Sequence, residues 1–367
     1  MLDLIPSNFV VITLPIALQV VVLGFIGGIL SGFIGSGGAF FMTPGMMNLG
    51  VQGNIAVASN ITHKFGKAMV GSKKHGDLGN VDKKLSIFML FTAAVGIQLA
   101  VYVMKIMSGD SHDAGKSAAT DLYISLVFVI ILSIVSLSML KDIIKSQKEE
   151  TTGPSTKIVE FLKQYRLYPL IYFPVADVYV SLWVILICGL ATGYLAGTIG
   201  VGGFIGVPAM IYVFGVPSAV AAGSELYLAM FMGAYGALNY AYQGMVDIRL
   251  TALLYGGSLF GIYIGAYGTK VVKEIYIRLV TAVIILLCVI SRMIAIPMYL
   301  QQLGIITMDA SHNVYFNTAS KLMLYFSGIS GGMLILFFVF RAYFQRQRIQ
   351  ASLTTHTPKR IVSQQYV

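Results

Sequence analysis

The sequence predicts an all-α polytopic membrane protein with two inverted-topology repeats that contain broken or half helices, plus one extra C-terminal helix. Composition, the lengths of the apolar runs and a duplicated glycine pattern lead to this prediction. Of the 367 residues, 57% are apolar and only 11% are charged, whereas soluble domains average about 25% charged residues. This composition, with two cysteines and a mean hydropathy of +0.80, excludes an ordinary soluble enzyme, a disordered chain and a disulfide scaffold.

The lengths of the apolar runs predict which segments cross a bilayer. A helix needs about 20 apolar residues to span ~30 Å of hydrocarbon. Seven runs meet this requirement, at approximately 9–34, 85–107, 121–140, 180–199, 250–271, 277–297 and 319–340. Two further runs, 55–72 and 219–241, are long enough but contain polar residues. The short runs 39–49 and 204–214 cannot cross, so we expect half-helices or re-entrant segments there.

The two halves of the chain match each other at an offset of 165 residues. Six of the seven glycines between positions 24 and 38 fall on a glycine of the second half. The pairs are Gly24/Gly189, Gly28/Gly193, Gly32/Gly197, Gly35/Gly200, Gly37/Gly202 and Gly38/Gly203. Because glycine makes up only 39 of the 367 residues, chance does not explain this agreement. We therefore predict a duplication, with repeat 1 at 9–140 and repeat 2 at 180–297.

The distribution of positive charge predicts that the two copies are oppositely oriented. The loop 73–84 contains four lysines, whereas Arg249 is the only basic residue of its counterpart, 238–249. Cytoplasmic loops carry an excess of Lys and Arg, so we expect the first loop inside and the second outside. Antiparallel repeats of this kind occur in many secondary transporters.

We expect a single transmembrane domain, 1–367, in the cytoplasmic membrane. The same charge rule predicts the side of the membrane on which its remaining segments lie. The basic stretch 141–179 is predicted to be a cytoplasmic linker, with part of it helical. The extra helix 319–340 returns the chain to the cytoplasm, where we expect the basic tail 343–367. The loop 298–317 has no Lys or Arg, so it is expected outside, together with the N-terminus.

The first part of the duplicated glycine block is expected to pack helices together. Its glycines recur every four residues, at 24, 28 and 32 and again at 189, 193 and 197. Glycines at this spacing lie on one helix face and allow another backbone to approach closely.

The second part of the block ends a helix in each repeat. It reads GSGG at 35–38 and GVGG at 200–203, each followed by a short apolar run and a proline. Clustered glycines leave backbone N–H groups free, and the N-terminal end of the next half-helix favours an anion. The candidate binding residues are Gly35, Gly37, Gly38, Gly200, Gly202 and Gly203. The alternative is a kink that serves only packing.

Polar residues at equivalent positions of the next helices are further candidates for substrate binding. Ser59 and Asn60 correspond, at the same offset, to Ser224 and Glu225. Small hydroxyl groups near a helix start suit two roles, the binding of an oxyanion and helix capping or packing. Both roles remain open at this point.

Two lysines and one acid lie inside these predicted helices. Lys64 is near the middle of its helix, where a buried charge suggests a function such as attracting an anion. The alternative, for Lys64 and more so for Lys67, is that the side chain snorkels to the inner membrane face. Glu225 has three interpretations, which are a proton relay, a partner of Lys64 and a satisfied polar residue.

The sequence has no catalytic or metal-binding pattern. It contains no HExxH motif and no CxxC pair, and its two cysteines, Cys188 and Cys288, lie in apolar runs. The segment 200–206 reads GVGGFIG, which misses the third glycine of GxGxxG. The net charge of +10 comes without a basic stripe interleaved with aromatic residues, which disfavours nucleic acid. We expect no metal, no cofactor, no nucleic-acid partner and no enzymatic activity.

Three duplicated segments carry a resemblance to a known family. They are GGILSGFIGSGGAFFMTP with GLATGYLAGTIGVGGFIGVP, AVASN with AAGSE, and GNVDKKL with GMVDIRL. With them the chain resembles the sulfite exporter TauE/SafE family of prokaryotic anion permeases. The resemblance implies transport of small sulfur-containing anions, such as sulfite or sulfonates, across the cytoplasmic membrane. The long linker, the extra helix, the segment NITHKFGK and the acidic Glu225 depart from the usual pattern.

The sequence therefore predicts a secondary transporter for small anions that works by alternating access and is coupled to a proton or another ion. The glycine breaks are expected to face each other near the bilayer midplane. Half-helix N-termini, Ser59, Ser224 and Lys64 would stabilise the anion there. The alternatives are a passive anion channel, a membrane scaffold or accessory subunit and, disfavoured by the missing catalytic residues, a membrane enzyme.

Overall fold

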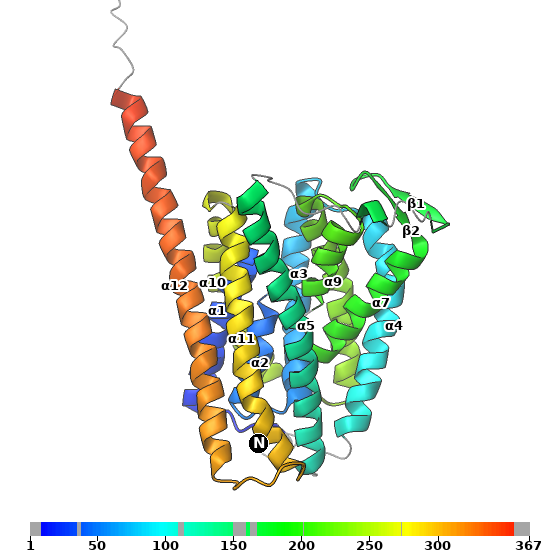
Figure 1. Cartoon of the computed structure of the whole chain (residues 1–367), viewed down its shortest axis with the longest axis vertical. Helices are drawn as coiled ribbons and strands as arrows, with labels where there is room; N and C mark the ends of the chain where they lie inside the picture. The colour runs from blue at the N-terminus through cyan, green and yellow to red at the C-terminus, as the bar shows by residue number, and fades with distance from the viewer. Residues whose placement is uncertain are drawn as a thin grey trace, which may run out of the picture.

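The computed structural model describes residues 9–34, 38–108, 114–149, 159–161, 167–200, 202–272 and 274–355. These residues form a bundle of long helices with a two-stranded hairpin at one end, which we call the hairpin end (Figure 1). The predictions made for Gly35, for Gly37, for the N-terminus and for the last residues of the tail fall outside the described residues.

The helices of the first repeat include one short element between long ones. Their bounds are α1 Leu14–Ile34, α2 Ala39–Asn48, α3 Gly53–Asp77, α4 Lys83–Ser108 and α5 Ala114–Glu149. At 10 residues and about 1.5 Å per residue, α2 covers only half of a bilayer's hydrocarbon. The predicted half-helix at 39–49 is therefore confirmed.

The second repeat has the same order of elements. Their bounds are α7 Leu182–Ile199, α8 Gly203–Pro208, the π-helix η2 Ala209–Val213, α9 Ser218–Tyr242, α10 Ile248–Val271 and α11 Glu274–Gln302. Together α8 and η2 form the short element that the run 204–214 predicts. Pro208 has no N–H for an α-helical hydrogen bond, and the helix widens directly after it. π-Helical turns are frequent at functional sites.

Two elements differ in extent or kind from the sequence prediction. The helix α12 runs over His312–Thr355, well beyond the predicted 319–340, and extends past the rest of the bundle (Figure 1). Within the stretch predicted as a linker, α5 continues to Glu149, and the strands β1 Leu170–Phe173 and β2 Val178–Ser181 form an antiparallel hairpin. The sequence prediction contained no strand.

Left-handed glycines end equivalent helices in the two repeats. Gly50 and Gly215 follow the two short helices with φ of +86° and +78°. Gly79 and Gly244 follow α3 and α9 with φ of +72° and +68°. Each pair is separated by the offset of 165 residues, and only glycine adopts this backbone conformation without strain. The duplication is thus present in the backbone as well as in the sequence.

Contacts between the repeats show that they are inverted. The Ser224 hydroxyl, near the start of α9, accepts from the Asp82 N–H, which follows the end of α3, at 2.8 Å. In the equivalent contact, Ser59 near the start of α3 accepts from the Asp247 N–H, which follows α9, at 3.3 Å. Each of these equivalent helices therefore begins at the end of the bundle where the other one ends.

The first part of the glycine block packs helices of different repeats together, as predicted. The pairs that pack are α1 with α10 and, equivalently, α7 with α4. A Cβ at Gly24 would lie 2.5 Å from the Leu254 carbonyl oxygen, and one at Gly189 would lie 2.6 Å from the Met89 carbonyl oxygen. Such contacts leave no room for a side chain, so the backbones themselves touch.

The described helices include seven that are long and apolar enough to cross a membrane. They correspond to the seven apolar runs of the sequence. The more polar helices α3 and α9 have 25 residues each and lie inside the bundle (Figure 1). The chain is therefore an all-α polytopic membrane protein.

Candidate functional site

The two short helices meet at their N-terminal ends. Phe40 of α2 and Phe204 of α8 make an edge-to-face contact with ring centroids 4.8 Å apart. The Thr43 hydroxyl of α2 donates to the Ile199 carbonyl at the end of α7, at 3.2 Å. The described parts of the two glycine breaks therefore lie together in the buried centre of the molecule, as the sequence predicted.

The described glycines shape the start of each short helix. Gly200 ends α7 with φ of +76°, and a Cβ there would lie 3.0 Å from the Asn60 amide nitrogen. Gly38 and Gly202 are the N-cap residues of α2 and α8, so the N-cap residue supplies no side chain to the first N–H groups. Gly203 is the buried first residue of α8. Uncapped N–H groups at a helix start are suited to an anion.

Asn60 connects α3 to the first short helix. Its amide nitrogen donates to the Ala39 carbonyl at 3.0 Å and to the Thr43 hydroxyl at 2.7 Å. These two acceptors fix the orientation of the amide. Its oxygen is buried and has no hydrogen-bond partner among the described residues.

A buried ion pair joins α3 of one repeat to α9 of the other. Lys64 Nζ lies 3.3 Å from Glu225 Oε1, and the two side chains are 5% and 0% exposed. The second carboxylate oxygen of Glu225 has no partner among the described residues. A Cβ at Gly206 of α8 would lie 3.2 Å from Glu225 Cγ, so the second short helix packs against the Glu225 side chain.

A second lysine extends the polar face of α3. Asn60, Lys64 and Lys67 are four and three residues apart, which puts them on one face of the helix. Lys67 Nζ donates to the Ser31 hydroxyl of α1, a contact inside the bundle. Lys64 is buried and Lys67 is half-buried, so the contacts of both lysines lie within the protein, and snorkelling stays an alternative prediction for Lys67.

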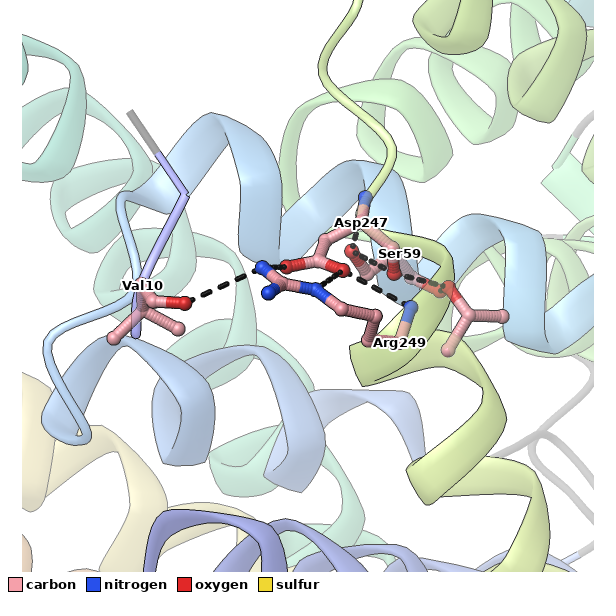
Figure 2. A network of polar contacts seen from close by, with 5 residues as sticks. Val10, Ser59, Asp247 and Arg249 are labelled. Carbon is pink, nitrogen blue, oxygen red and sulfur yellow. Dashed lines mark hydrogen bonds and ion pairs between the residues drawn. The ribbon is translucent and has the colours of Figure 1, made fainter. Parts of the chain in front are cut away.

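The hydroxyl groups of Ser59 and Ser224 bond the backbone at the start of α10 and of α4. Figure 2 shows Ser59 against Asp247, and the Thr251 hydroxyl lies 3.4 Å from the Ser59 carbonyl. In the equivalent contact, the Ser86 hydroxyl donates to the Ser224 carbonyl at 2.8 Å. The structure therefore gives both serines the packing role. Binding of an anion by them stays a prediction.

The two aspartates beside these serines fasten different segments. Asp247 pairs with Arg249 at 2.7 Å, and the Arg249 guanidinium donates to the Val10 carbonyl at 3.3 Å (Figure 2). Asp82 instead accepts the backbone N–H groups of Val175 and Ala176, both at 3.1 Å. The second repeat thus holds the segment at Val10, through Arg249, and the first repeat holds the hairpin, through Asp82.

Sequence reasoning did not single out Arg292. This residue of α11 is fully buried and donates to Asn48 Oδ1 at the end of α2 and to the Ser320 hydroxyl of α12, the latter at 3.0 Å. A cation is favourable at the C-terminal end of a helix, so Arg292 stabilises the outer end of the short helix α2. A charge inside the apolar run 277–297 is the signal that could have found it.

Tyr255 of α10 was also not predicted as part of this region. Its hydroxyl accepts from the Gly66 N–H at 2.9 Å and donates to the Thr62 carbonyl at 3.1 Å. These two backbone groups of α3 stand in the i, i+4 relation of a helical hydrogen bond. A side chain inserted at such a point favours a bend, and this one lies within a turn of Lys64.

The described residues contain no group of three His, Cys, Asp or Glu side chains that could hold a metal ion. The site contains the buried Lys64, the half-buried Lys67, the buried Glu225 carboxylate with one unpaired oxygen, and the N-terminal ends of two short helices. This arrangement is suited to a small anion held in a dry, polar space.

A family model described as sulfite exporter TauE/SafE matches residues 20–292. The range includes all of the candidate residues and ends before α12. Three proteins of Bacillus subtilis (strain 168) are also similar to the chain. Probable membrane transporter protein YunE is 22% identical over 276 residues, which are 73% of this chain and 93% of that protein.

The other two relatives are similar to nearly the same extent. Probable membrane transporter protein YjnA is 22% identical over 253 residues, 68% of this chain and 89% of that protein. Probable membrane transporter protein YdhB is 23% identical over 263 residues, 71% and 93% of the two chains. No solved structure matches the chain.

Proposed function

Because the chain belongs to the sulfite exporter TauE/SafE family, we propose that it is a secondary transporter that carries small sulfur-containing anions, such as sulfite or sulfonates, across the cytoplasmic membrane. The family and its relatives make the chain a membrane transporter. The identity of the substrate and the alternating-access mechanism are the proposed part.

The observation that carries this proposal is the buried Lys64, which is paired with Glu225 one helical turn from Asn60, the residue that contacts α2. Its charge is removed from water and faces the Glu225 carboxylate, with Lys67 one turn further along α3. An isolated charge in this environment is strongly unfavourable. A small anion that reaches Lys64 from either side would be bound by this charge and by the helix N-termini.

Alternating access has a structural basis in the inverted repeats. The anion site lies between α3 and α9, equivalent helices of opposite direction, so a motion that opens it to one side has an equivalent that opens it to the other. The paired helices α1 with α10 and α4 with α7 touch through backbone, and we expect each pair to move as a rigid unit.

The proposed orientation follows from the charges at the hairpin end. The lysines at the end of α3 and at the start of α4 lie there, since Lys84 donates to the Tyr172 carbonyl of the hairpin. The hairpin end would face the cytoplasm, together with the end of α12, and the N-terminus would lie outside. The loop with Asp309 joins α11 and α12 at the opposite end (Figure 1).

Flux measurements in proteoliposomes test the proposal. We expect saturable uptake of at least one of sulfite, sulfoacetate, thiosulfate and sulfate, and loss of this uptake in Gly202→Leu, whose side chain would meet Ala196 and the Thr192 carbonyl. Gly76→Leu is the matched control, because a Cβ there meets nothing within 4 Å. Absence of flux for all four anions would contradict the proposal, and current without saturation would indicate a channel.

A further inference from the structure

Two equivalent positions of the repeats each hold a buried oxygen atom with no partner among the described residues. One is Asn60 Oδ1 in the first repeat, and the other is Glu225 Oε2 in the second. Both side chains are 0% exposed. An unpaired buried acceptor is unfavourable, and more so when the group is charged, so each oxygen is suited to receive a hydrogen-bond donor or a proton during function.

Only one of these two groups can bind and release a proton. Asn60 is an amide, and both protons of its nitrogen are already used in contacts to Ala39 and Thr43. Glu225 is a carboxylate whose other oxygen lies 3.3 Å from Lys64. Of these two equivalent positions, only that of Glu225 therefore holds a group that can accept a proton.

The charges that face Glu225 come from few elements. On α3 they are Lys64, at 3.3 Å, and Lys67, which interacts with Glu225 electrostatically. Farther along, His75 of α3 lies against Gly223, and Asp82 before α4 bonds Ser224. The segment 182–213, which includes α7, α8 and η2, contains no Asp, Glu, Lys, Arg or His.

Lys64 is thus shared between Glu225 and any anion that enters. If the anion joins while Glu225 is ionised, two negative charges compete for one nearby ammonium group in a dry site. If Glu225 first takes up a proton, the ion pair is released and Lys64 is free to bind the anion. The proton offsets one negative charge of the anion, so the charge of the site stays unchanged for a monovalent anion and falls by one rather than two for a divalent anion such as thiosulfate or sulfoacetate. Interactions between charges are strongest where water is excluded.

Building on the proposed anion transport, we propose that Glu225 is the proton-carrying residue of an anion–proton symporter, with one proton carried for each anion. On the loading side a proton from water adds to a carboxylate oxygen of Glu225, and the anion binds the released ammonium group of Lys64. On the other side the anion leaves, the O–H bond breaks, the proton passes to water, and the Lys64–Glu225 pair forms again. Since anion and proton each favour binding of the other, their binding is coupled reciprocally.

The test uses the full chain in proteoliposomes, with the membrane potential held at zero by potassium and valinomycin. The probes are thiosulfate and sulfoacetate. With one proton per anion, a pH difference of about one unit supports up to about tenfold accumulation of the anion. We expect this accumulation, together with proton movement of equal size, in the unaltered protein and in Asp309→Asn, which makes the same carboxyl-to-amide change on an exposed loop.

Glu225→Gln should lose the accumulation and the proton movement, with a smaller reduction of anion exchange under equal pH. Accumulation driven by the pH difference in Glu225→Gln would overturn the inference. Anion flux in the unaltered protein that does not change with the pH difference would also overturn the inference, although it would leave the proposed anion transport intact. No anion flux at all in the unaltered protein would remove the transport proposal itself.

Glu225→Gln leaves Lys64 without its charged partner, which can impair folding. A second measurement therefore uses only the unaltered protein. Calorimetric titration of the purified, unaltered protein with thiosulfate, in two buffers of different ionisation enthalpy, gives the number of protons taken up. One proton per anion bound supports the inference, and none overturns it.

Discussion

Gly200 shows how a single residue shapes the centre of the molecule. Its φ of +76° is a conformation that a side chain strains, and its Cα faces Asn60 and Thr43 of the other repeat. Two requirements therefore coincide at this position. One is the backbone conformation that ends α7, and the other is space for the contact between the repeats.

The variant Gly200→Ala separates these requirements when it is compared with Gly244→Ala. Both glycines are left-handed, so each substitution should lower stability by about 1–2 kcal/mol. At Gly244 a Cβ meets nothing within 4 Å, whereas at Gly200 it meets Asn60 at 3.0 Å. We expect at least tenfold slower anion flux in Gly200→Ala and near-normal flux in Gly244→Ala, at similar melting temperatures. Equal flux in the two variants would contradict the role given to Gly200.

Among the elements, the hairpin depends most on one distant residue. The Asp82 carboxylate accepts both Val175 and Ala176 N–H groups in the turn, and Lys84 holds the Tyr172 carbonyl. A two-stranded hairpin alone is only marginally stable in water. These contacts therefore fix the linker on the start of α4.

Asp82→Asn should loosen the hairpin without unfolding the bundle. Hydrogen bonds to a charged group contribute about 1.5–3 kcal/mol each, and the amide provides a neutral acceptor in place of the carboxylate. We expect hydrogen exchange at the amides of Val175 and Ala176 to quicken at least tenfold. Asp77→Asn, which alters an exposed residue at the same end, should leave both amides as they are. Unchanged exchange in Asp82→Asn would show that other contacts hold the hairpin.

Elements that depend on local sequence were predictable, and those that depend on distant contacts were not. The short helices at 39–49 and 204–214 follow from run length and glycine clusters. The hairpin does not, because Asp82 holds it from about 90 residues away in the chain. The role of Ser59 was left open for the same reason, since its partner Asp247 lies in the other repeat.

The central ion pair was predictable in part. The offset between the repeats places Glu225 at the position of Asn60, and a buried lysine suggests a partner of opposite charge. The sequence offered the pairing with Lys64 as one interpretation, and the 3.3 Å contact confirms it. The unpaired oxygens of Asn60 and Glu225 could not be foreseen, because they depend on how four helices meet.

At the scale of the whole molecule, the two ends of the helix bundle differ in charge. The lysines at the end of α3 and the start of α4 lie at the hairpin end, whereas the loop with Asp309 lies at the opposite end. A single labelling experiment can assign these ends. Background labelling should be low, because Cys288 is buried and Cys188 is partly buried in a predicted span.

Lys74→Cys and Asp309→Cys place one exposed thiol at each end. In intact cells, a membrane-impermeant maleimide added outside should label Asp309→Cys and spare Lys74→Cys until the cells are opened. The reverse pattern would contradict the proposed orientation while leaving the inverted repeats intact.

The proposed transport requires that Lys64 binds the transported anion. The most direct measurement is the affinity of the purified protein for the anion, compared among Lys64→Met, the double variant Lys64→Met/Glu225→Gln and Lys105→Met, whose lysine is exposed. The double variant removes both charges and so avoids leaving Glu225 unpaired. We expect at least a tenfold loss of affinity, about 1.4 kcal/mol, in both Lys64 variants at low and high salt, and none in Lys105→Met. Unchanged affinity in folded protein of both Lys64 variants would contradict the proposed role of Lys64.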